Sequence, residues 1–586
     1  MKNPDELRRS GIAIAPGVAI GPAFIIEQSG LPVPEYTLPA AQVEKELTRF
    51  HGAITKVQKH LSQLRQKAEG LTTGAEDMTL LLDAYKGMLS GSRLVRGVEE
   101  IISGQHLNAE AAIQKQTAAL RASFAAMDDA YLAARGEDVA EVGNRLIRSL
   151  LQQNYNPFAD APEGCVILAE EITPADAALL NPDGITGLAT VLGGPEGHTA
   201  IMARALGIAA ISGVAALCHG IKTGDTVIID GRKGEIIIHP EAATLQAYKQ
   251  ELARKRQEEK KLKALRDVPA VTLDGAPISL QANIELLRDV EPALESGATA
   301  IGLLRTEFMF MNRPDLPDEE EQYTALRDFV TNLDGRVLTI RTLDVGGEKI
   351  ASALGEDGNE SVNPALGLRA IRLGLKQPKL LDTQLTAILR ASMHGPVRIL
   401  LPMISSVGQV KQVRARLLTL ERRLHRRGIK LKGLPPLGAM IEIPSAALVA
   451  DALAKQCDFF SIGSNDLTQY TLAIDRGDER VADLYDPFHP AVLRLIQFTA
   501  AAGWRANIPV SLCGEIAGDR RATALLLGLG LREFSMSPVR LPAVKQEVTQ
   551  IALPDAVAFA EKIMAQTDEN EIRTLLAGGP DRGKGR

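Results

Sequence analysis

The 586-residue sequence lacks the features of a nucleic-acid-binding, disulfide-rich or membrane-spanning protein. Basic residues number 66 against 72 acidic ones, and aromatic residues make up 4% of the chain. Nucleic-acid binding usually shows a basic excess or aromatic stacking platforms, so we expect neither DNA nor RNA as a partner. The four cysteines are widely spaced without a CxxC pair, which argues against disulfides and favours a reducing cytoplasm: Cys165, Cys218, Cys457 and Cys513. No uninterrupted apolar run reaches the roughly 20 residues of a membrane span.

The first apolar segment, residues 11–26, follows Arg8 and Arg9 and superficially resembles a secretory leader. Pro16 and Pro22, each next to a glycine, break this segment into short strand-like clusters. We therefore expect the segment to belong to the folded protein, and the protein to be cytoplasmic.

The length predicts several domains, since one domain usually has about 100–200 residues. Residues 37–153 have helical periodicity, and their breaks predict a bundle of four helices. The breaks fall near residues 70–74, 104–106 and 127–129. Residues 154–240 alternate strand-like runs with short helices, as in a small α/β domain. We expect residues 1–36 to rejoin this domain, which makes the bundle an insertion.

Residues 241–268 are predicted to form a linker helix. Its segment 249–266 holds eight basic and three acidic residues and has a helix-forming composition. A nucleic-acid or nuclear-targeting segment is the alternative interpretation, but a solvated connecting helix accounts for the same pattern.

Residues 269–575 contain eight strand-like runs separated by helical stretches. The runs are 278–284, 300–306, 337–344, 397–403, 437–443, 459–466, 509–514 and 533–537. Eight such alternations predict a (β/α)8 barrel, and a doubly wound open sheet is the alternative. The polar residues 576–586 are expected to form a flexible tail. The predicted fold class is thus multidomain α/β.

Polar side chains follow several of the predicted barrel strands, where catalytic residues of such barrels lie. They include Arg305, Arg341, Glu442, Asp466 and Cys513. Arginine forks match phosphate and carboxylate oxygens, and two carboxylates suit Mg²⁺. These residues predict a site for a small phosphorylated anion held through Mg²⁺, while unrelated structural ion pairs remain the alternative.

A second candidate site is the glycine-rich turn that precedes and includes His198, followed by an apolar helical run. A histidine at the beginning of a helix would have free N–H groups beside it, which favour an anion. A neutral imidazole is also nucleophilic. His198 is therefore a candidate phosphoryl acceptor, with a purely structural histidine as the alternative.

Several segments together resemble enzyme I of the bacterial phosphotransferase system, the phosphoenolpyruvate–protein phosphotransferase family. They occur in the family's order over nearly the whole chain: GIAIAPGVAIGPA, GGPEGHTAIMARALGI, GLLRTEFMFM, RTLDVGGEK, NPALGLRAIR, PMISS, IEIPSAA, DFFSIGSNDLTQYTLAIDRG and SLCGEIAGD. The resemblance implies a swivelling phosphohistidine α/β domain with an inserted helical bundle, followed by a barrel. The bundle would bind the phosphocarrier protein HPr, and the barrel would bind phosphoenolpyruvate and form a homodimer.

The resemblance also implies roles for individual residues. His198 would be phosphorylated by phosphoenolpyruvate and pass the group to HPr as the first step of sugar uptake, and Cys513 would protonate the enolpyruvate product. Glu442 and Asp466 would bind Mg²⁺. The residues implied in substrate binding are Arg305, Arg341, Arg369, Asn465, Asp466 and Arg476.

The sequence departs from the family in two places. Pro195, Glu196 and Gly197 stand where a basic residue, a threonine and a serine usually precede the histidine, so we expect transfer with an altered rate or pH dependence. In the expected HPr-binding helices, Glu76, Asp77 and Asp83 remain acidic. Tyr85 and Lys86 occupy the neighbourhood in which family members have a histidine, which predicts an HPr partner with a different complementary surface.

Two other functions fit part of this pattern. Pyruvate phosphate dikinase and phosphoenolpyruvate synthase share the phosphohistidine domain and barrel, but they need a nucleotide-binding domain. The sequence has no Walker-type loop and no such unit before the phosphohistidine domain. A non-catalytic regulatory paralogue is the second alternative, and the retained site residues argue against it.

Overall fold

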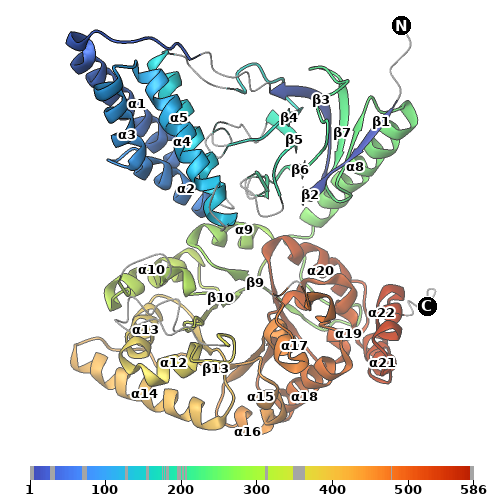
Figure 1. Ribbon diagram of the computed structural model, residues 1–586. Coiled ribbons are helices and arrows are strands. Elements are labelled where there is room, and N and C mark those ends of the chain that lie inside the picture. The colour runs from blue at the N-terminus through green and yellow to red at the C-terminus, as the bar shows by residue number, and fades with distance from the viewer. Residues whose placement is uncertain are drawn as a thin grey trace. The chain divides into compact units, whose positions relative to one another are not determined.

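The computed structural model divides into two compact units, residues 1–256 and 257–586 (Figure 1). It describes residues 6–26, 33–68, 75–125, 130–152, 157–173, 176, 179, 184–194, 199–200, 203–204, 207–310, 315–346, 363–476, 478 and 480–580. None of the helices in these ranges combines the length and the apolar character that crossing a bilayer requires.

The bundle of the first unit contains five helices among the described residues, whereas the sequence predicted four. They are α1 (Val43–Ala68), α2 (Ala75–Met88), α3 (Arg93–Gln105), α4 (Ala109–Ala125) and α5 (Ala130–Leu150). The missed break lies between α2 and α3. Gly91 has a left-handed backbone with a φ of 69°, and the hydroxyl of Ser92 accepts hydrogen bonds from the N–H groups of Leu94 and Val95. The break between the two helices is only four residues long, so the pattern of apolar residues does not reveal it.

An eight-stranded sheet forms the α/β part of the first unit, with the order β1-β8-β7-β3-β4-β5-β6-β2 (Figure 1). Its strands are β1 (Leu7–Ser10), β2 (Ile12–Ala15), β3 (Val18–Ile26), β4 (Cys165–Ala169), β5 (Ile185–Thr190), β6 (Ala209–Ser212), β7 (Thr226–Asp230) and β8 (Glu235–Ile238). Because β3 pairs with β4 and β7, the prediction that the first apolar segment rejoins this part is confirmed. The sequence missed β6, whose four buried residues follow directly on a segment predicted as helical.

The two edge strands of this sheet are consecutive in the sequence. Leu7 of β1 pairs with Ile238, and Ile12 of β2 pairs with Ser212 at the other edge. Gly11 alone joins the two strands, and one residue spans only a few ångströms. The sheet therefore curls until its two edges meet at Gly11.

The second unit contains a closed barrel of eight parallel strands, which confirms the predicted barrel over the open sheet (Figure 1). The strands are β9 (Ser279–Ile284), β10 (Ile301–Leu304), β11 (Leu338–Arg341), β12 (Val397–Leu401), β13 (Leu437–Ile441), β14 (Phe459–Ile462), β15 (Val510–Leu512) and β16 (Glu533–Met536). The pairing of β16 with β9, for example Glu533 with Ser279, closes the ring.

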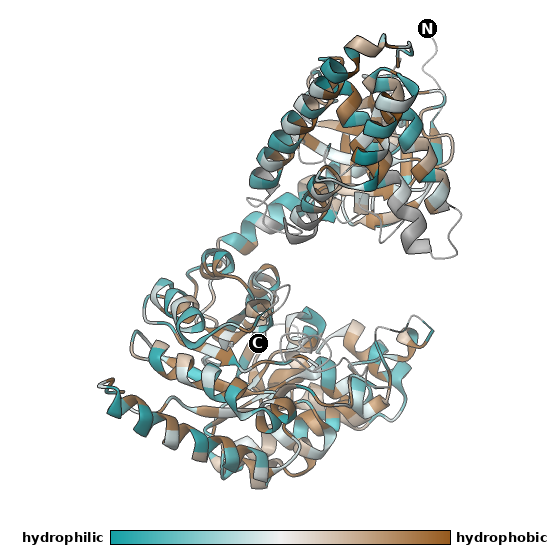
Figure 2. Cartoon of the chain, turned by 60° about the vertical axis from the view of Figure 1, so that its left-hand side comes forward, coloured by the Kyte–Doolittle hydropathy of each residue, from teal (hydrophilic) through white to brown (hydrophobic). Residues whose placement is uncertain are grey.

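Helices surround the barrel, and apolar residues gather on the strands at its centre (Figure 2). The helices are α9 (Val290–Glu295), α10 (Glu319–Asn332), α12 (Ala370–Lys376), α13 (Pro378–Ala391), α14 (Val407–Arg426), α15 (Pro444–Leu448), α16 (Ala450–Ala454), α17 (Ser464–Leu472), α18 (Pro490–Ala506), α19 (Thr523–Gly528), α20 (Leu541–Val548), α21 (Leu553–Met564) and α22 (Glu569–Gly578). The helix α8 (Ala242–Lys263) precedes the barrel within the segment predicted as the linker helix.

The barrel strands are shorter than the predicted runs, chiefly at their carboxyl ends. Asn465 and Asp466 were placed at the end of a strand, but β14 ends at Ile462 and both residues lie in the first turn of α17.

Candidate active site

Arg341, the last residue of β11, is buried at the rim between two carboxylates. Its Nη2 lies 3.0 Å from Glu307 Oε1, and its Nη1 lies 2.9 Å from Asp344 Oδ2. The Glu307 carboxylate also accepts a hydrogen bond of 3.0 Å from the Asp344 backbone N–H. Burial alone would lower the pKa of Arg341, but Glu307 and Asp344 outweigh it and the pKa lies above its ordinary value. The guanidinium is therefore fixed in place and charged.

Asp344 joins Arg341 to a second arginine. Arg369, just before α12, donates from Nη2 to Asp344 Oδ1 over 2.9 Å. Burial would raise the pKa of Asp344, yet the charges of Arg341 and Arg369 outweigh it and hold the pKa below its ordinary value of 3.8. The Nε atoms of both arginines are buried and have no hydrogen-bond partner among the described atoms. Both Nε–H groups are thus buried donors that no described atom of the protein satisfies.

Glu442, directly after β13, is completely buried. Its Oε1 accepts a hydrogen bond from the backbone N–H of Met403, which has a left-handed φ of 56°. Its Oε2 has no hydrogen-bond partner in the described part of the chain. Burial and the nearby charges of Asp344 and Asp466 raise the pKa of Glu442 well above its ordinary value. The charge of Arg341 opposes this rise without cancelling it, so the buried carboxylate with its unpaired oxygen is only partly compensated.

Two glycines let the beginning of α17 approach Glu442 and β15. A Cβ atom on Gly463 would lie 2.9 Å from Glu442 Oε2, and one on Gly514 would lie 1.7 Å from Ser464 Oγ. Asn465 Oδ1 accepts a hydrogen bond of 2.9 Å from the Glu515 N–H. The sequence therefore folds so that Asn465 and Asp466 lie beside the ends of β13 and β15.

Cys513 follows β15 and is also buried at the rim. Its thiol lies 3.4 Å from the Ile462 carbonyl oxygen, to which it can donate a hydrogen bond. Burial raises the pKa of this thiol to about 11. At neutral pH Cys513 is consequently a protonated thiol, suited to donate a proton and unsuited to act as a nucleophile.

The other two predicted arginines are more exposed than Arg341. Arg305 follows β10, and its guanidinium forms an ion pair with Glu285. Arg476 lies beyond α17 with an exposed side chain. Burial raises the pKa of the Tyr485 hydroxyl, and the charge of Arg476 opposes part of that rise, which places Arg476 on the same side of the barrel as α17.

The residues of the predicted phosphohistidine turn, Pro195, Glu196, Gly197 and His198, lie outside the described part of the structure. Thr199 and Ala200 directly after it are helical and buried. The side chains of Glu76 and Asp77 also lie outside the described residues.

Tyr85 and Lys86 of α2 lie in different environments. Tyr85 is buried and donates a hydrogen bond of 3.1 Å to Asp138 Oδ1 on α5, whereas Lys86 is exposed to solvent. The Tyr85 side chain therefore packs inside the bundle and is not part of its surface.

Sequence reasoning missed residues that support the rim from outside it. Gln384 of α13 accepts a hydrogen bond of 2.9 Å from Leu343 N–H and donates one of 3.1 Å to Thr306 Oγ1. Asn283 of β9 donates to the Cys513 carbonyl oxygen over 3.2 Å. Their partners are distant in sequence, so no local signal identifies them.

The carboxylates of Glu442 and Asp466 fit a divalent cation. The unpaired, buried Glu442 Oε2 and the excess of negative charge around it are what such a cation would relieve. Within the described ranges, no group of three or more His, Cys, Asp or Glu side chains is arranged to hold a metal. Mg²⁺ suits a two-carboxylate site, because it completes its coordination shell with water and substrate oxygens.

Three families of phosphoenolpyruvate-utilising enzymes match this chain. The N-terminal domain matches residues 10–135, the mobile domain residues 161–234, and the phosphoenolpyruvate-binding domain residues 259–553.

Individual proteins match over almost the whole length. A phosphoenolpyruvate-protein phosphotransferase of Cupriavidus necator is 40% identical over 576 residues, covering 97% of this chain and 98% of the relative. The protein of that name from Haemophilus influenzae is 37% identical over 567 residues, with the same coverage. A solved structure of an enzyme I protein is 31% identical, covers 42% of this chain and 99% of its own, and has a TM-score of 0.37. Because it is 37–40% identical to the two full-length relatives over 97% of its residues, the chain belongs to the family of phosphoenolpyruvate-protein phosphotransferases.

Proposed function

We propose that the protein transfers the phosphoryl group of phosphoenolpyruvate to His198, releases pyruvate, and then passes the group to a histidine of the phosphocarrier protein HPr. The observation that supports this most strongly is the identity of 37–40% to relatives named for this activity over 97% of the chain. The buried arrangement of Arg341, Glu442 and Cys513 at one barrel rim supports it independently.

In this proposal the arginines bind the anionic substrate. Arg341 is held by Glu307 and Asp344, so it meets the substrate in one orientation and pays little conformational entropy on binding. Arg369 is held in the same way by Asp344. Arg305 is half-buried and paired with Glu285, and Arg476 is exposed and able to move towards a ligand. Asn465 at the beginning of α17 would donate a further hydrogen bond. A charged, preorganised cradle of this kind stabilises the negative charge of phosphoryl transfer.

Glu442 and Asp466 would hold Mg²⁺. The cation would neutralise charge on the phosphoryl and carboxylate oxygens of the substrate.

Cys513 would complete the release of pyruvate. When the phosphoryl group leaves for His198, the remaining enolate needs a proton on its methylene carbon to become pyruvate. The Cys513 thiol is protonated at neutral pH, so its S–H bond can supply this proton, and the thiolate regains one from solvent. The favourable conversion of the enol to the ketone makes phosphoenolpyruvate a strong donor, so the reaction needs no ATP.

The domain roles belong to the same proposal. Residues 1–36 and 154–240 would form the swivelling phosphohistidine domain, and residues 37–153 would bind HPr. Residues 241–268 would link them to the barrel, residues 269–575, through which the protein would form a homodimer in the cytoplasm. Exposed Lys86 would lie at the HPr-binding surface, and charge reversal by Lys86→Glu that leaves HPr affinity unchanged would contradict this placement.

The test is incubation with radiolabelled phosphoenolpyruvate and Mg²⁺, measuring pyruvate release and an acid-labile, base-stable label on the protein. The wild type should be labelled and should transfer the label to HPr, whereas His198→Ala should not be labelled. Absence of label on the wild type, with phosphoenolpyruvate still bound, would instead support a regulatory paralogue. A Glu196→Thr variant tests whether Glu196 shifts the pH dependence of labelling, and an unchanged pH–rate profile would contradict that effect.

A further inference from the structure

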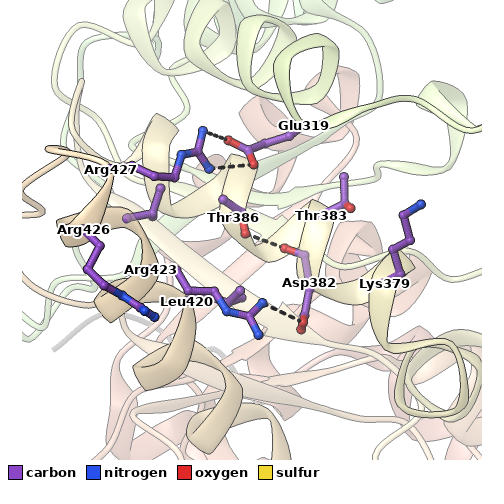
Figure 3. Close-up of a pocket in the computed structure, with 10 residues that line it drawn as sticks. Glu319, Lys379, Asp382, Thr383, Thr386, Leu420, Arg423, Arg426 and Arg427 are labelled. Carbon is purple, nitrogen blue, oxygen red and sulfur yellow. Dashed lines mark hydrogen bonds and ion pairs between the residues drawn. The ribbon is translucent and has the colours of Figure 1, made fainter.

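A hollow of about 820 Å³ lies in the outer helical layer of the barrel, between α13, the end of α14 and the beginning of α10 (Figure 3). Its volume is within the range of small-molecule pockets. None of the residues that line it belongs to the candidate active site. The basic residues of its lining are Lys379, Arg423, Arg426 and Arg427, and the acidic ones are Glu319 and Asp382.

Both acidic residues are already paired with arginines. Glu319 accepts hydrogen bonds of 2.9 and 2.7 Å from Arg427 and one of 2.8 Å from Arg390. The Arg427 guanidinium accordingly lowers the pKa of Glu319 below its ordinary value. Asp382 accepts a hydrogen bond of 2.8 Å from Arg416, and Arg423 lies 3.7 Å from its other oxygen. Neither carboxylate is therefore available to neutralise the remaining cations.

Lys379 and Arg426 are those remaining cations. Within the described part of the chain neither side chain forms an ion pair, and the Arg426 side chain makes only a long hydrogen bond of 3.4 Å from Nε to the Arg422 carbonyl. Figure 3 shows them at opposite ends of the hollow, with Thr383 and Thr386 between them. The hollow thus has a positive charge at each end and hydroxyl groups between.

Helix stability does not account for both cations. Arg426 lies in the last turn of α14, where a positive charge is favoured by the helix dipole. Lys379 lies in the first turn of α13, where the same dipole disfavours a positive charge. Lys379 therefore has no local advantage at this position, and an anion in the hollow would compensate it.

We propose that this hollow binds a small molecule with a chain of linked phosphates, either inorganic tripolyphosphate or the triphosphate of a nucleotide. The Arg426 fork would bind one terminal phosphate and the Lys379 ammonium the other end of the chain. Thr383 would offer its hydroxyl to the phosphate between them. The site is separate from the phosphoenolpyruvate-binding rim.

Residue-resolved acetylation of the full-length protein tests this binding. Lysines are acetylated with and without tripolyphosphate, and mass spectrometry compares Lys379 with the exposed Lys411 at the beginning of α14. Tripolyphosphate should slow acetylation of Lys379 about tenfold, as expected when one charged hydrogen bond holds the amine, and should leave Lys411 unchanged. Equal protection of both lysines, or none, would overturn the proposal.

Two charge reversals on α14 separate the site from general electrostatic attraction. Arg426→Glu should abolish protection of Lys379, whereas the matched change Arg422→Glu, at an exposed arginine outside the hollow, should preserve it. Equal loss in both variants would overturn the proposal. Stronger protection by ATP than by tripolyphosphate would identify a nucleotide as the ligand, and the reverse would identify inorganic polyphosphate. Protection by an oligoglutamate peptide as strong as by tripolyphosphate would contradict a phosphate-specific site.

Discussion

Arg341 and Glu442 are both buried at the barrel rim, but their charges are compensated to different extents. Arg341 has two carboxylates against it, whereas Glu442 has one backbone N–H and further negative charge nearby. The charge of Arg341 is thus well compensated, whereas that of Glu442 is compensated only in part, by Arg341. This asymmetry fits a substrate that supplies anionic oxygens to the arginines, and Glu442 would help to hold a divalent cation that supplies positive charge to the site.

Glu307→Gln should weaken phosphoenolpyruvate binding because it removes one of the two charges that hold Arg341. The amide keeps the side-chain shape, so we expect kcat/KM for pyruvate formation to fall about tenfold, the loss of one charged hydrogen bond. Steady-state kinetics measures this. Glu291→Gln, at an exposed glutamate of α9, is the control, and equal kinetics in both variants would contradict a positioning role for Glu307.

Cys513→Ala should slow pyruvate release by about 100-fold or more, as for the loss of a general acid. Because burial raises the pKa of this thiol to about 11, its acid form should persist through mildly alkaline pH. The wild-type rate should therefore show no loss attributable to this thiol between neutral pH and about pH 10. The control is Cys457→Ala, because burial raises the pKa of that barrel thiol to about 12 but it lies away from the rim. An equal loss in both variants would indicate damage to packing.

At the scale of single elements, the ends of the strands are held by side chains from the helices outside. Gln384 of α13 bonds to the chain after β10 and after β11, so one helix fixes the spacing of two rim segments. Gly463 and Gly514 contribute in another way, because their lack of a side chain lets the beginning of α17 lie close to Glu442 and to the end of β15. The spacing of these rim segments is thus set partly by residues, such as Gln384, that have no proposed contact with the substrate.

Gln384→Leu should raise KM for phosphoenolpyruvate and lower stability together. The change leaves the buried N–H of Leu343 without its acceptor, and the Thr306 hydroxyl keeps only its hydrogen bond to the Arg341 carbonyl among the described residues. An unsatisfied buried N–H should cost about 1–3 kcal/mol. Gln322→Leu is the control, since Gln322 is equally buried on α10 but its side chain, among the described residues, bonds only to the Pro317 carbonyl. We expect Gln322→Leu to lower the unfolding free energy without changing KM. Equal KM shifts in the two variants would contradict the role of Gln384 in positioning the two rim segments.

The ion pairs of Glu319 should make the contact between α10, α13 and α14 sensitive to acid. The pKa of Glu319 is lowered below 4.5 by Arg427 and Arg390, so its stabilisation is present above pH 4.5 and is lost as the pH falls through the lower, folded-state pKa. Glu319→Gln should cost about 1 kcal/mol at neutral pH, since the pairs are partly exposed, and nothing at strongly acidic pH. Urea unfolding at both pH values measures this, with the more exposed Glu320→Gln as the control of smaller effect.

These elements also show where sequence reasoning succeeds and where it does not. The alternation of short apolar runs with helical stretches predicts the barrel, because its strands are short segments of mostly buried residues. The residues after each strand predict the composition of the rim. Gln384 and Asn283 could not be predicted, since their partners are distant in sequence and neither residue stands in a distinctive motif. Ser92 and the strand β6 were missed because a short cap and four buried residues leave too little periodicity.

At the scale of the whole molecule, the chain has two units with separate hydrophobic cores. Among the described residues, the main core of one unit lies within residues 270–576 and that of the other within residues 14–210. Units with their own cores commonly unfold in separate steps. A ligand of the barrel should then stabilise one unit and leave the other unchanged.

Calorimetry of His198→Ala should show two unfolding transitions, and phosphoenolpyruvate should raise the midpoint of the barrel transition only. This variant is used because it cannot turn the substrate over. At a hundredfold excess over Kd, the barrel should gain about 2.7 kcal/mol. Inorganic phosphate at the same concentration is the control. An equal rise of both midpoints would show that the two units unfold as one.

The curled sheet of the first unit has a consequence for the protein as it is synthesised. The first two strands form both edges of that sheet, and their partners lie some 200 or more residues later in the chain. At about 5–20 residues per second, the ribosome needs at least about ten seconds to supply those partners. Meanwhile the helices of the inserted bundle, whose contacts are more local, can already fold. During synthesis, β1 and β2 therefore remain unpaired until β8 and β6 have been made. A chaperone would be most useful to the nascent chain in this period.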